Sequence, residues 1–338
     1  MSGHAHPHAP KHAHSLSAED SASLTHGVTG LSVAVASVLT LIKALVWVST
    51  GSVAMLASLA DSGLDVFAAL ATFFAVRYAV EPPDLEHRFG HGKAEAFASL
   101  IQAGLVFASA ALVAREAIER LFHPITPIGE GGGLIVMAVS VALTGALILA
   151  QSRVLRQANS VAVRGDRMHY IADLASNLIA FAGIGLSAIL RNSAADAIAG
   201  IAVVGWLVWG AISVFRAASV ELMDRELADE SRARIVALMT EDPRVKDVHQ
   251  LRTRASGPFI HIQLHADLEP TLSLVEAHQV VVAAEKRVLE AFPAADIIIH
   301  PDPRGYAEPH GGAFAEEDYP HEHDLPSQPQ PAETVPAR

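Results

Sequence analysis

The 338-residue chain contains no cysteine. Disulfide bonds and metal sites built on thiolates are therefore excluded, and any metal chemistry must use imidazole and carboxylate groups. The chain has 18 histidines that could serve this purpose. Charged residues are also scarce, at 18% of the chain, against roughly 25% in soluble domains. This scarcity, together with a mean hydropathy of +0.32, favours a membrane protein.

An excess of positive charge is also missing, because the formal net charge is −12. We therefore expect no nucleic-acid partner. A cleavable secretion signal is not visible, since the first residues, MSGHAHPHAPKHAHS, lack an apolar core. We expect two disordered tails, residues 1–26 and residues 306–338. Their histidines either collect metal or are simply solvated: His4, His6, His8, His12, His14, His310, His321 and His323.

Long apolar blocks fill the middle of the chain. Each has about 20 residues, enough to cross roughly 30 Å of hydrocarbon as a helix. Prolines such as Pro82, Pro83 and Pro124 separate the blocks, because proline ends a helix. We predict an all-α membrane domain over residues 27–217 with six transmembrane helices. The predicted spans cover residues 28–50, 53–78, 94–122, 132–155, 168–190 and 194–215.

Lysine and arginine are divided unequally between the two sides of these spans. Basic residues accumulate on the cytoplasmic side of a membrane protein. The richer side, and with it both termini, is therefore predicted to be cytoplasmic. The residues on the richer side are Arg77, Arg88, Lys93, Arg153, Arg156, Arg164, Arg167, Arg216 and Arg225. Those on the other side are Arg115, Arg120 and Arg191.

The sequence pattern changes after the last apolar block and indicates a soluble domain over residues 218–305. Helical spacing of apolar residues alternates there with the period of two that half-buried strands show. The order α-β-β-α-β predicts a small α+β fold. The predicted elements are a helix at 229–240, strands at 245–253 and 258–268, a helix at 273–291 and a strand at 296–300.

Two pairs of potential metal ligands lie inside the predicted spans. Asp61 and Asp65 are four residues apart in the second span, and His169 and Asp173 are four apart in the fifth. Residues at this spacing share one face of a helix. Placing a carboxylate near the middle of a span costs about 3 kcal/mol. A purely structural role for all four residues, as hydrogen-bonded polar groups without a metal, is therefore disfavoured. Facing each other, the two helices would form a four-ligand site suited to zinc. Lys43, also within a span, could lie on an ion pathway, but we expect it to snorkel or to pair locally, because its side chain is long.

Further candidate ligands lie outside the spans. Asp84, His87 and His91 follow the second span, and their spacing alone fits a metal site or a polar loop equally well. In the soluble domain, His261 and His265 share one face of a predicted strand. Several histidines converge in this small domain, which favours a metal site. The candidates there are His249, His261, His265, His278, His300 and Asp302.

These motifs resemble the cation diffusion facilitator family, most closely its bacterial zinc and ferrous-iron efflux subgroup. The likeness extends over about residues 31–303 and is carried by DSGLD, FGHGKAE, HYIAD, LRTRASGP and IIIHPDP. The resemblance implies a homodimer in the bacterial inner membrane with a metallochaperone-like cytoplasmic domain. It also implies export of divalent metal in exchange for protons. Zinc is the expected ion, followed by cadmium and ferrous iron, as substrate and regulatory ligand and without a prosthetic group.

The resemblance also implies roles for individual residues. The transport site would be Asp61, Asp65, His169 and Asp173, and the loop group Asp84, His87 and His91 would form a second zinc site. A two-metal site in the soluble domain, bridged by its aspartate, would use His249, His265, His278, His300 and Asp302. His261 lies outside this pattern. An interlocking ion pair would join Lys93 and Asp224, although an ordinary surface pair of little energetic value fits equally well.

We expect His169 to couple metal and proton movement, because imidazole changes its charge near physiological pH. Two other functions fit parts of the pattern. Paired aspartates could activate water in an intramembrane hydrolase. A metal-sensing scaffold could use the soluble domain without transport. A metal-flux assay separates these alternatives from an exporter.

Overall fold

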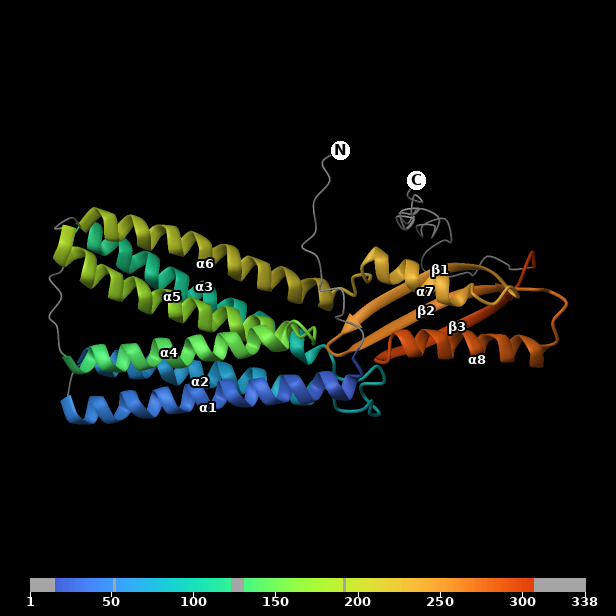
Figure 1. Ribbon diagram of the computed structural model, residues 1–338, viewed down its shortest axis with the longest axis horizontal. Coiled ribbons are helices and arrows are strands. Elements are labelled where there is room, and N and C mark those ends of the chain that lie inside the picture. Colours follow the sequence, from blue (N-terminus) through green and yellow to red (C-terminus); the bar gives the residue numbers. More distant parts are fainter. Residues whose placement is uncertain (1–15, 51–52, 123–130, 191–192, 307–338) are drawn as a thin grey trace, which may run out of the picture. The chain divides into compact units, whose positions relative to one another are not determined.

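The computed structural model describes residues 16–50, 53–122, 131–190 and 193–306 of the chain (Figure 1). The chain divides into two compact units, Met1–Met223 and Asp224–Arg338. The histidine-rich stretch 1–15 and the stretch 307–338 lie outside the described residues. The predictions made for these two tails therefore stay predictions.

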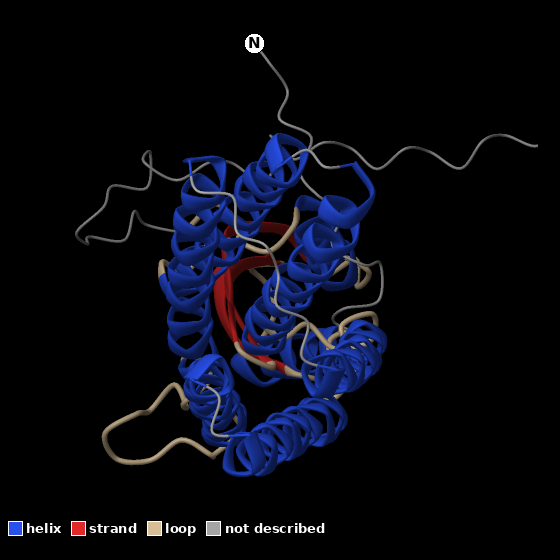
Figure 2. Ribbon diagram, turned by 90° about the vertical axis from the view of Figure 1, so that its left-hand side faces the viewer, coloured by secondary structure: helices blue, strands red, loops and turns tan. Residues whose placement is uncertain are grey.

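In its described part, the first unit forms a bundle of six α-helices, seen end-on in Figure 2. Five of them, α1 to α4 and α6, are long and apolar enough to cross a membrane, a result that covers only the described residues. The first half of α5 is more polar, because it carries several charged residues. The predicted count of six spans is therefore not confirmed. The helices are α1 Ala18–Thr50, α2 Val53–Ala79, α3 Ala94–Phe122, α4 Gly131–Val154, α5 Val161–Leu190 and α6 Ser193–Leu222.

Two helices begin well before the predicted spans. The helix α1 begins at Ala18, so residues 18–26 are helical and not part of a disordered tail as predicted. Ser17 caps this end, because its Oγ accepts a backbone hydrogen bond at 3.0 Å from the residue three positions on. The helix α5 begins at Val161 and not near residue 168, and the Oγ of Ser160 accepts a backbone bond at 3.2 Å. Apolar patterning misses such polar first turns.

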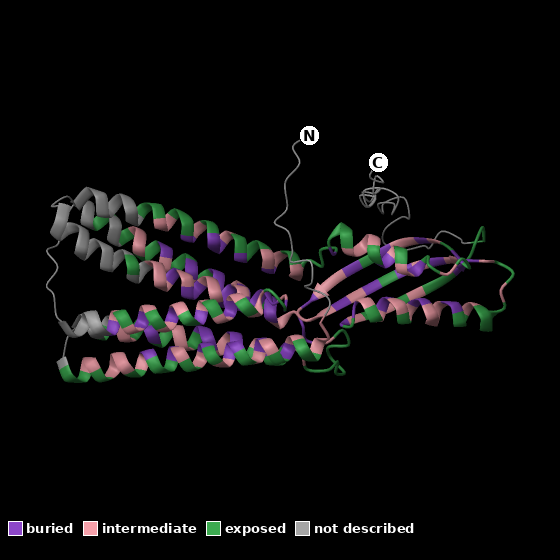
Figure 3. Cartoon of the chain, viewed as in Figure 1, coloured by how far each residue is buried: buried purple, intermediate pink, exposed green. Residues whose placement is uncertain are grey.

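Small side chains bring the helices of the first unit close together. The helix α3 packs along α6, α1 packs along α2, and α5 contacts α3, α4 and α6. Membrane helices associate in this way because small residues let their backbones approach. Many large apolar side chains of this unit are exposed instead, as on a lipid-facing surface. Figure 3 shows exposed residues along the described parts of these helices. The buried contact of α3, α5 and α6 consists of Val106, Ala110, Ala172, Leu207 and Ala211.

The second unit is an α+β domain with the predicted order α-β-β-α-β. Its sheet has the strand order β1-β2-β3, in which β1 and β2 are antiparallel and β2 and β3 are parallel. The predicted fold of this domain is therefore confirmed. Its elements are α7 Asp229–Met239, β1 Val245–Ser256, β2 Phe259–Leu268, α8 Leu274–Ala291 and β3 Ala295–Pro303.

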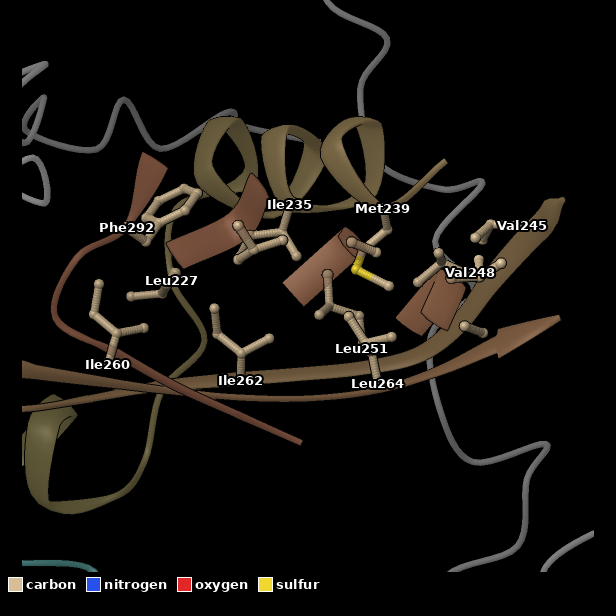
Figure 4. Close-up of a cluster of buried hydrophobic side chains, with 14 of the residues drawn as sticks. Leu227, Ile235, Met239, Val245, Val248, Leu251, Ile260, Ile262, Leu264 and Phe292 are labelled. Atoms are coloured by element: carbon tan, nitrogen blue, oxygen red, sulfur yellow. The ribbon is translucent and has the colours of Figure 1, made fainter. Parts of the chain in front are cut away.

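The core of this domain lies between one face of the sheet and the two helices (Figure 4). Alternate residues of β2, including Ile262 and Leu264, pack in the same buried cluster as Ile235 of α7. The residues between them, such as His261 and His265, point to the opposite face, because side chains alternate along a strand. Burial of the apolar face therefore leaves a polar face of the sheet for ligands.

Candidate metal centres

The first candidate metal centre lies between α2 and α5 and consists of Asp65, His169 and Asp173. We call it the helix-pair centre. The Nε2 atom of His169 lies 3.2 Å from Oδ1 of Asp65 and 3.6 Å from Oδ2 of Asp173. One ligand atom from each residue falls within 4.8 Å of the other two. The three side chains are therefore close enough to bind one ion.

Burial differs among these three side chains. That of His169 is 5% exposed, whereas those of Asp65 and Asp173 are 24% and 25% exposed. Among the described residues, Nδ1 of His169 is buried without a hydrogen-bond partner. Its Nε2 is the ring atom that faces the carboxylates. One nitrogen and several carboxylate oxygens form a donor set that suits zinc and other divalent transition ions.

Asp61, the fourth predicted ligand, is not part of this group. It lies one turn before Asp65 on α2 and is exposed. As a ligand it stays a prediction, and its side chain would have to turn toward the ion. The nearby Lys43 pairs locally as predicted, because its Nζ lies 2.6 Å from Oγ of Ser62 and 3.4 Å from the carbonyl oxygen of Ser58.

The second candidate is the loop centre, formed by Asp84, His87 and His91 between α2 and α3. Asp84 Oδ1 lies 3.4 Å from His87 Nδ1, and Asp84 Oδ2 lies 3.3 Å from His91 Nε2. The backbone N–H groups of His87 and Glu86 donate to Asp84 and lower its pKa to about 2. Asp84 is therefore ionised at neutral pH and could bind a cation without first releasing a proton.

The loop centre is less firmly held than the helix-pair centre. The side chains of His87 and Asp84 are 50% and 51% exposed, and only His91, at 4%, is buried. The ring of His91 lies 4.4 Å from that of Tyr78 in α2. Packing therefore fixes only His91 among the three candidate ligands. The positions of Asp84 and His87 depend on the conformation of the loop.

The third candidate is the sheet centre, formed by His249 of β1, His265 of β2 and Asp302 of β3. Strand pairing sets His249 opposite His265 and His265 beside His300. Asp302 Oδ2 lies 2.8 Å from Nδ1 of His265 and 3.6 Å from Nε2 of His249. Its Oδ1 lies 3.3 Å from Nε2 of His300. Asp302 thus faces three imidazoles, two with Oδ2 and one with Oδ1. Its predicted role as a bridge between two metals stays a prediction.

Burial lowers the pKa of His265 below its ordinary value, and the hydrogen bond with Asp302 opposes this effect. Metal ions bind the neutral form of imidazole, so protons and metal compete for the same ring. A lowered pKa therefore favours metal binding by His265 at neutral pH.

Two other histidines of this domain lie outside the sheet centre. His278 is exposed on α8, a helix that packs on the opposite face of the sheet from His249 and His265. The structure therefore does not bring His278 to the predicted site. His261 contacts Asp296 instead, at 3.3 Å between Nδ1 and Oδ2. The exclusion of His261 from the predicted ligands stays a prediction.

The predicted ion pair of Lys93 and Asp224 would join residues of different units and stays a prediction. Within the first unit, Lys93 Nζ lies 3.4 Å from the carbonyl oxygen of Leu222. Within the second unit, Arg254 donates to Oδ2 of Asp224 at 3.2 Å.

Two carboxylates beside these centres were not among the predicted site residues. Asp166 lies one turn before His169 in α5 and is 1% exposed. Asp267 Oδ1 lies 3.7 Å from Nδ1 of His249. Sequence spacing could have identified both residues. Asp166 shares a helix face with His169, and Asp267 shares a strand face with His265.

Five apolar helices that can cross a membrane, with candidate cation ligands between α2 and α5 of the same bundle, define a class of protein. Ionisable groups inside a helical bundle typically mark the route of an ion. Imidazole and carboxylate groups match divalent metals. The fold and the helix-pair centre thus define a membrane carrier of metal cations.

Comparison with known proteins agrees with this class. The model of the cation efflux transmembrane domain matches residues 30–223, and that of the cation efflux protein cytoplasmic domain matches residues 227–304. The cation-efflux pump FieF of Shigella boydii serotype 18 is 40% identical over 270 residues, which cover 80% of this chain and 90% of that protein. FieF of Citrobacter koseri is 39% identical over 280 residues, which cover 82% and 93%.

A solved chain of the transporter CzrB in its zinc form shares 31% identity. It covers 25% of this chain and 98% of its own length, and its TM-score of 0.24 is too low to support a structural argument.

The chain belongs to the cation diffusion facilitator family. The predicted resemblance is therefore confirmed, and the protein is a multi-pass membrane protein for metal-cation efflux. Membership in a family of transporters sets aside the intramembrane hydrolase and the scaffold without transport.

Proposed function

We propose that this protein exports zinc from the cytoplasm across a bacterial inner membrane in exchange for protons, as a homodimer. Cadmium and ferrous iron are the other candidate ions. The observation that carries this proposal is the helix-pair centre, in which ligand atoms from two helices of the membrane unit lie within 4.8 Å of one another. Three ionisable groups brought together in such a bundle are costly unless an ion uses them.

The choice of zinc rests on the donor atoms. The chain has no thiolate, which disfavours copper(I). The nitrogen of His169 and the oxygens of Asp65 and Asp173 supply three positions. Asp61, one turn along α2, would supply the fourth after a change of rotamer. Four nitrogen and oxygen donors give the tetrahedral arrangement that zinc prefers.

Proton coupling follows from the same ligands. Metal binding requires neutral imidazole and ionised carboxylates, so protons and metal compete. The Nε2 of His169 faces both carboxylates, and a proton on that atom excludes the ion. An inward proton gradient would thus displace metal on the outer side and return with the empty carrier.

The transport cycle would follow alternating access. Metal enters the helix-pair centre from the cytoplasm, and the helices then tilt until the centre faces outward. The direction rests on the excess of lysine and arginine in the loops after α2, α4 and α6, which places both termini in the cytoplasm.

The other two centres would regulate transport. Metal at the sheet centre would draw the cytoplasmic domains of the two subunits together and favour transport. The loop centre would bind a second, weaker metal, because its ligands lie on an exposed loop. Lys93 and Asp224 would hold the cytoplasmic ends of the helices, with little energy if the pair is exposed.

Reconstituted vesicles test the proposal. The purified full chain is placed in proteoliposomes with an imposed pH gradient. Fluxes of zinc, cadmium, ferrous iron, manganese, cobalt and nickel are compared, alone and in competition. We expect zinc flux to be the largest and to reverse when the gradient is reversed. Flux that ignores the gradient would refute proton coupling, and the absence of flux for every metal would refute export.

A further inference from the structure

Asp166 is a buried carboxylate of α5 to which the proposed transport mechanism gives no role. Three hydrogen-bond donors from three other helices reach it. Ser32 Oγ of α1 lies 2.7 Å from Asp166 Oδ2, and Gln151 Nε2 of α4 lies 2.8 Å from the same oxygen. Gln102 Nε2 of α3 lies 3.2 Å from Asp166 Oδ1. One side chain therefore fastens α5 to α1, α3 and α4, and we call these four residues the Asp166 network.

The Asp166 network is closed to solvent. Ser32, Gln102 and Gln151 are each 0% exposed, and Asp166 is 1% exposed. A buried carboxylate of this kind depends on its donors, because water cannot replace a lost hydrogen bond. The four residues therefore stabilise one arrangement of the helices. Replacing any of them changes the hydrogen bonds of the others.

The network also reaches the other helix of the metal centre. Gln102 Nε2 lies 2.9 Å from Thr72 Oγ1 and 3.1 Å from the carbonyl oxygen of Ala68, both on α2. Thr72 lies two turns beyond Asp65 on the same helix, and Asp166 lies one turn before His169. Gln102 thus connects, through α3, the two helices that carry the helix-pair centre.

Contacts on both sides of His169 restrain α5. At Gly165, a β-carbon would lie 3.1 Å from Ser99 Oγ and 3.1 Å from Gln102 Cβ, so α5 and α3 approach closely at this level. The hydroxyl of Tyr170 donates to the carbonyl oxygen of Ser32 at 3.2 Å. These contacts leave α5 little freedom to rotate or slide while the network is intact.

We infer that Asp166 is a positioning residue of the transport site, which acts through its network on the rotation and spacing of α5 relative to α2. It thereby sets the separation of His169 Nε2 and Asp65 Oδ1. This inference rests on the proposed function, because it takes the helix-pair centre to bind the transported ion. Groups that orient metal ligands typically change affinity or activity by about 10–100-fold when they are removed.

The test compares zinc transport by the full chain in proteoliposomes for Asp166→Asn and the unaltered protein. Asparagine keeps the shape of aspartate, but its amide nitrogen cannot accept a hydrogen bond from Gln102 or Gln151. We expect KM for zinc to rise about tenfold or more. The turnover number kcat should change less, because all ligands of the helix-pair centre remain.

A matched pair on α1 removes one hydroxyl with less disturbance. Ser32→Ala deletes a donor of the network. Thr29→Val deletes a hydroxyl that is also 0% exposed. Among the described residues this hydroxyl bonds only within α1, at 2.8 Å to the carbonyl oxygen of Thr25 and 3.3 Å to that of His26. We expect Ser32→Ala to raise KM and Thr29→Val to leave it unchanged. This pair decides the question if Asp166→Asn does not fold.

A rescue experiment separates positioning from general stability. The double variant Asp166→Asn with Gln151→Glu moves the carboxylate from α5 to α4 and keeps one carboxylate and two amides in the network. We expect each single change to raise KM and the double variant to recover most of the loss. An unchanged KM in Asp166→Asn and Ser32→Ala overturns the inference. A fall in kcat as large as the rise in KM, not reversed in the double variant, also overturns it. Full flux by Asp173→Ala in the same assay would instead refute the transport site itself.

Discussion

The helix-pair centre and the loop centre have the same types of candidate ligand, but the first lies on rigid helices and the second on an exposed loop. Both consist of aspartate and histidine side chains within 4.8 Å of one another. In the helix-pair centre the ligands lie on two regular helices. In the loop centre, two of three ligands are half exposed on an irregular segment. Sites on regular elements hold their geometry better than sites on loops. On the proposed function, this difference in rigidity and burial would suit the two centres to different roles.

The largest expected effect lies in the helix-pair centre. Asp65→Ala or Asp173→Ala removes a ligand that no neighbouring group replaces, so zinc flux in proteoliposomes should be lost. The variants should still fold and dimerise, which size-exclusion chromatography checks. Transport at the unaltered rate by both variants would show that the ion binds elsewhere.

The sheet centre should affect regulation more than transport. We expect the double variant His265→Ala with Asp302→Ala to lose the dependence of flux on cytoplasmic zinc while it still transports. His261→Ala is the matched control, because His261 lies on the same strand face but contacts Asp296. An activation curve that does not change in the double variant would remove the sheet centre from the account.

The loop centre should contribute less. His91 is buried against Tyr78, so His91→Ala should weaken metal binding and flux more than His87→Ala. We expect a loss of about tenfold or less, the lower end for groups near a metal. Flux measurements on the two variants check the order. Complete loss of flux in either variant would show that the loop centre is required for transport, and would contradict its lesser role.

The smallest effect concerns packing between α5 and α3. Gly165→Ala places a methyl group 3.3 Å from the backbone of Ser99, and such overpacking costs about 1–3 kcal/mol. At Gly104 a β-carbon meets nothing within 4 Å, so Gly104→Ala is the control. Thermal unfolding of the purified chain should show a lower Tm for Gly165→Ala alone. Equal Tm values would mean that α5 is free to shift at this level.

Much of the fold follows from local patterns. Apolar runs located the helices of the membrane unit, and alternation located the strands of the second unit, because burial imposes a period on the sequence. The four-residue spacing of His169 and Asp173 predicted that they share a helix face. Their contact with Asp65 also required that α2 and α5 face each other. The cost of exposing charged groups to lipid favoured that arrangement.

The remaining features depend on contacts that a local pattern does not contain. Asp166 meets Ser32, which is 134 positions away in sequence. The register of β1 shifts between His249 and Arg252, beside the sheet centre, and Gln250 there has a φ of 51°. Strand alternation alone does not predict such a shift. The helical start at Ala18 was missed because its first turns are polar.

Zinc binding measured at equilibrium tests the central claim most directly. The background is the full chain with His87→Ala, His91→Ala, His265→Ala and Asp302→Ala, dialysed against zinc held low by a chelator. The account predicts about one tightly bound zinc per chain, since a tetrahedral centre takes a single ion. Adding Asp173→Ala should remove that zinc. Bound zinc that survives this last substitution would contradict the assignment of the ion to α2 and α5.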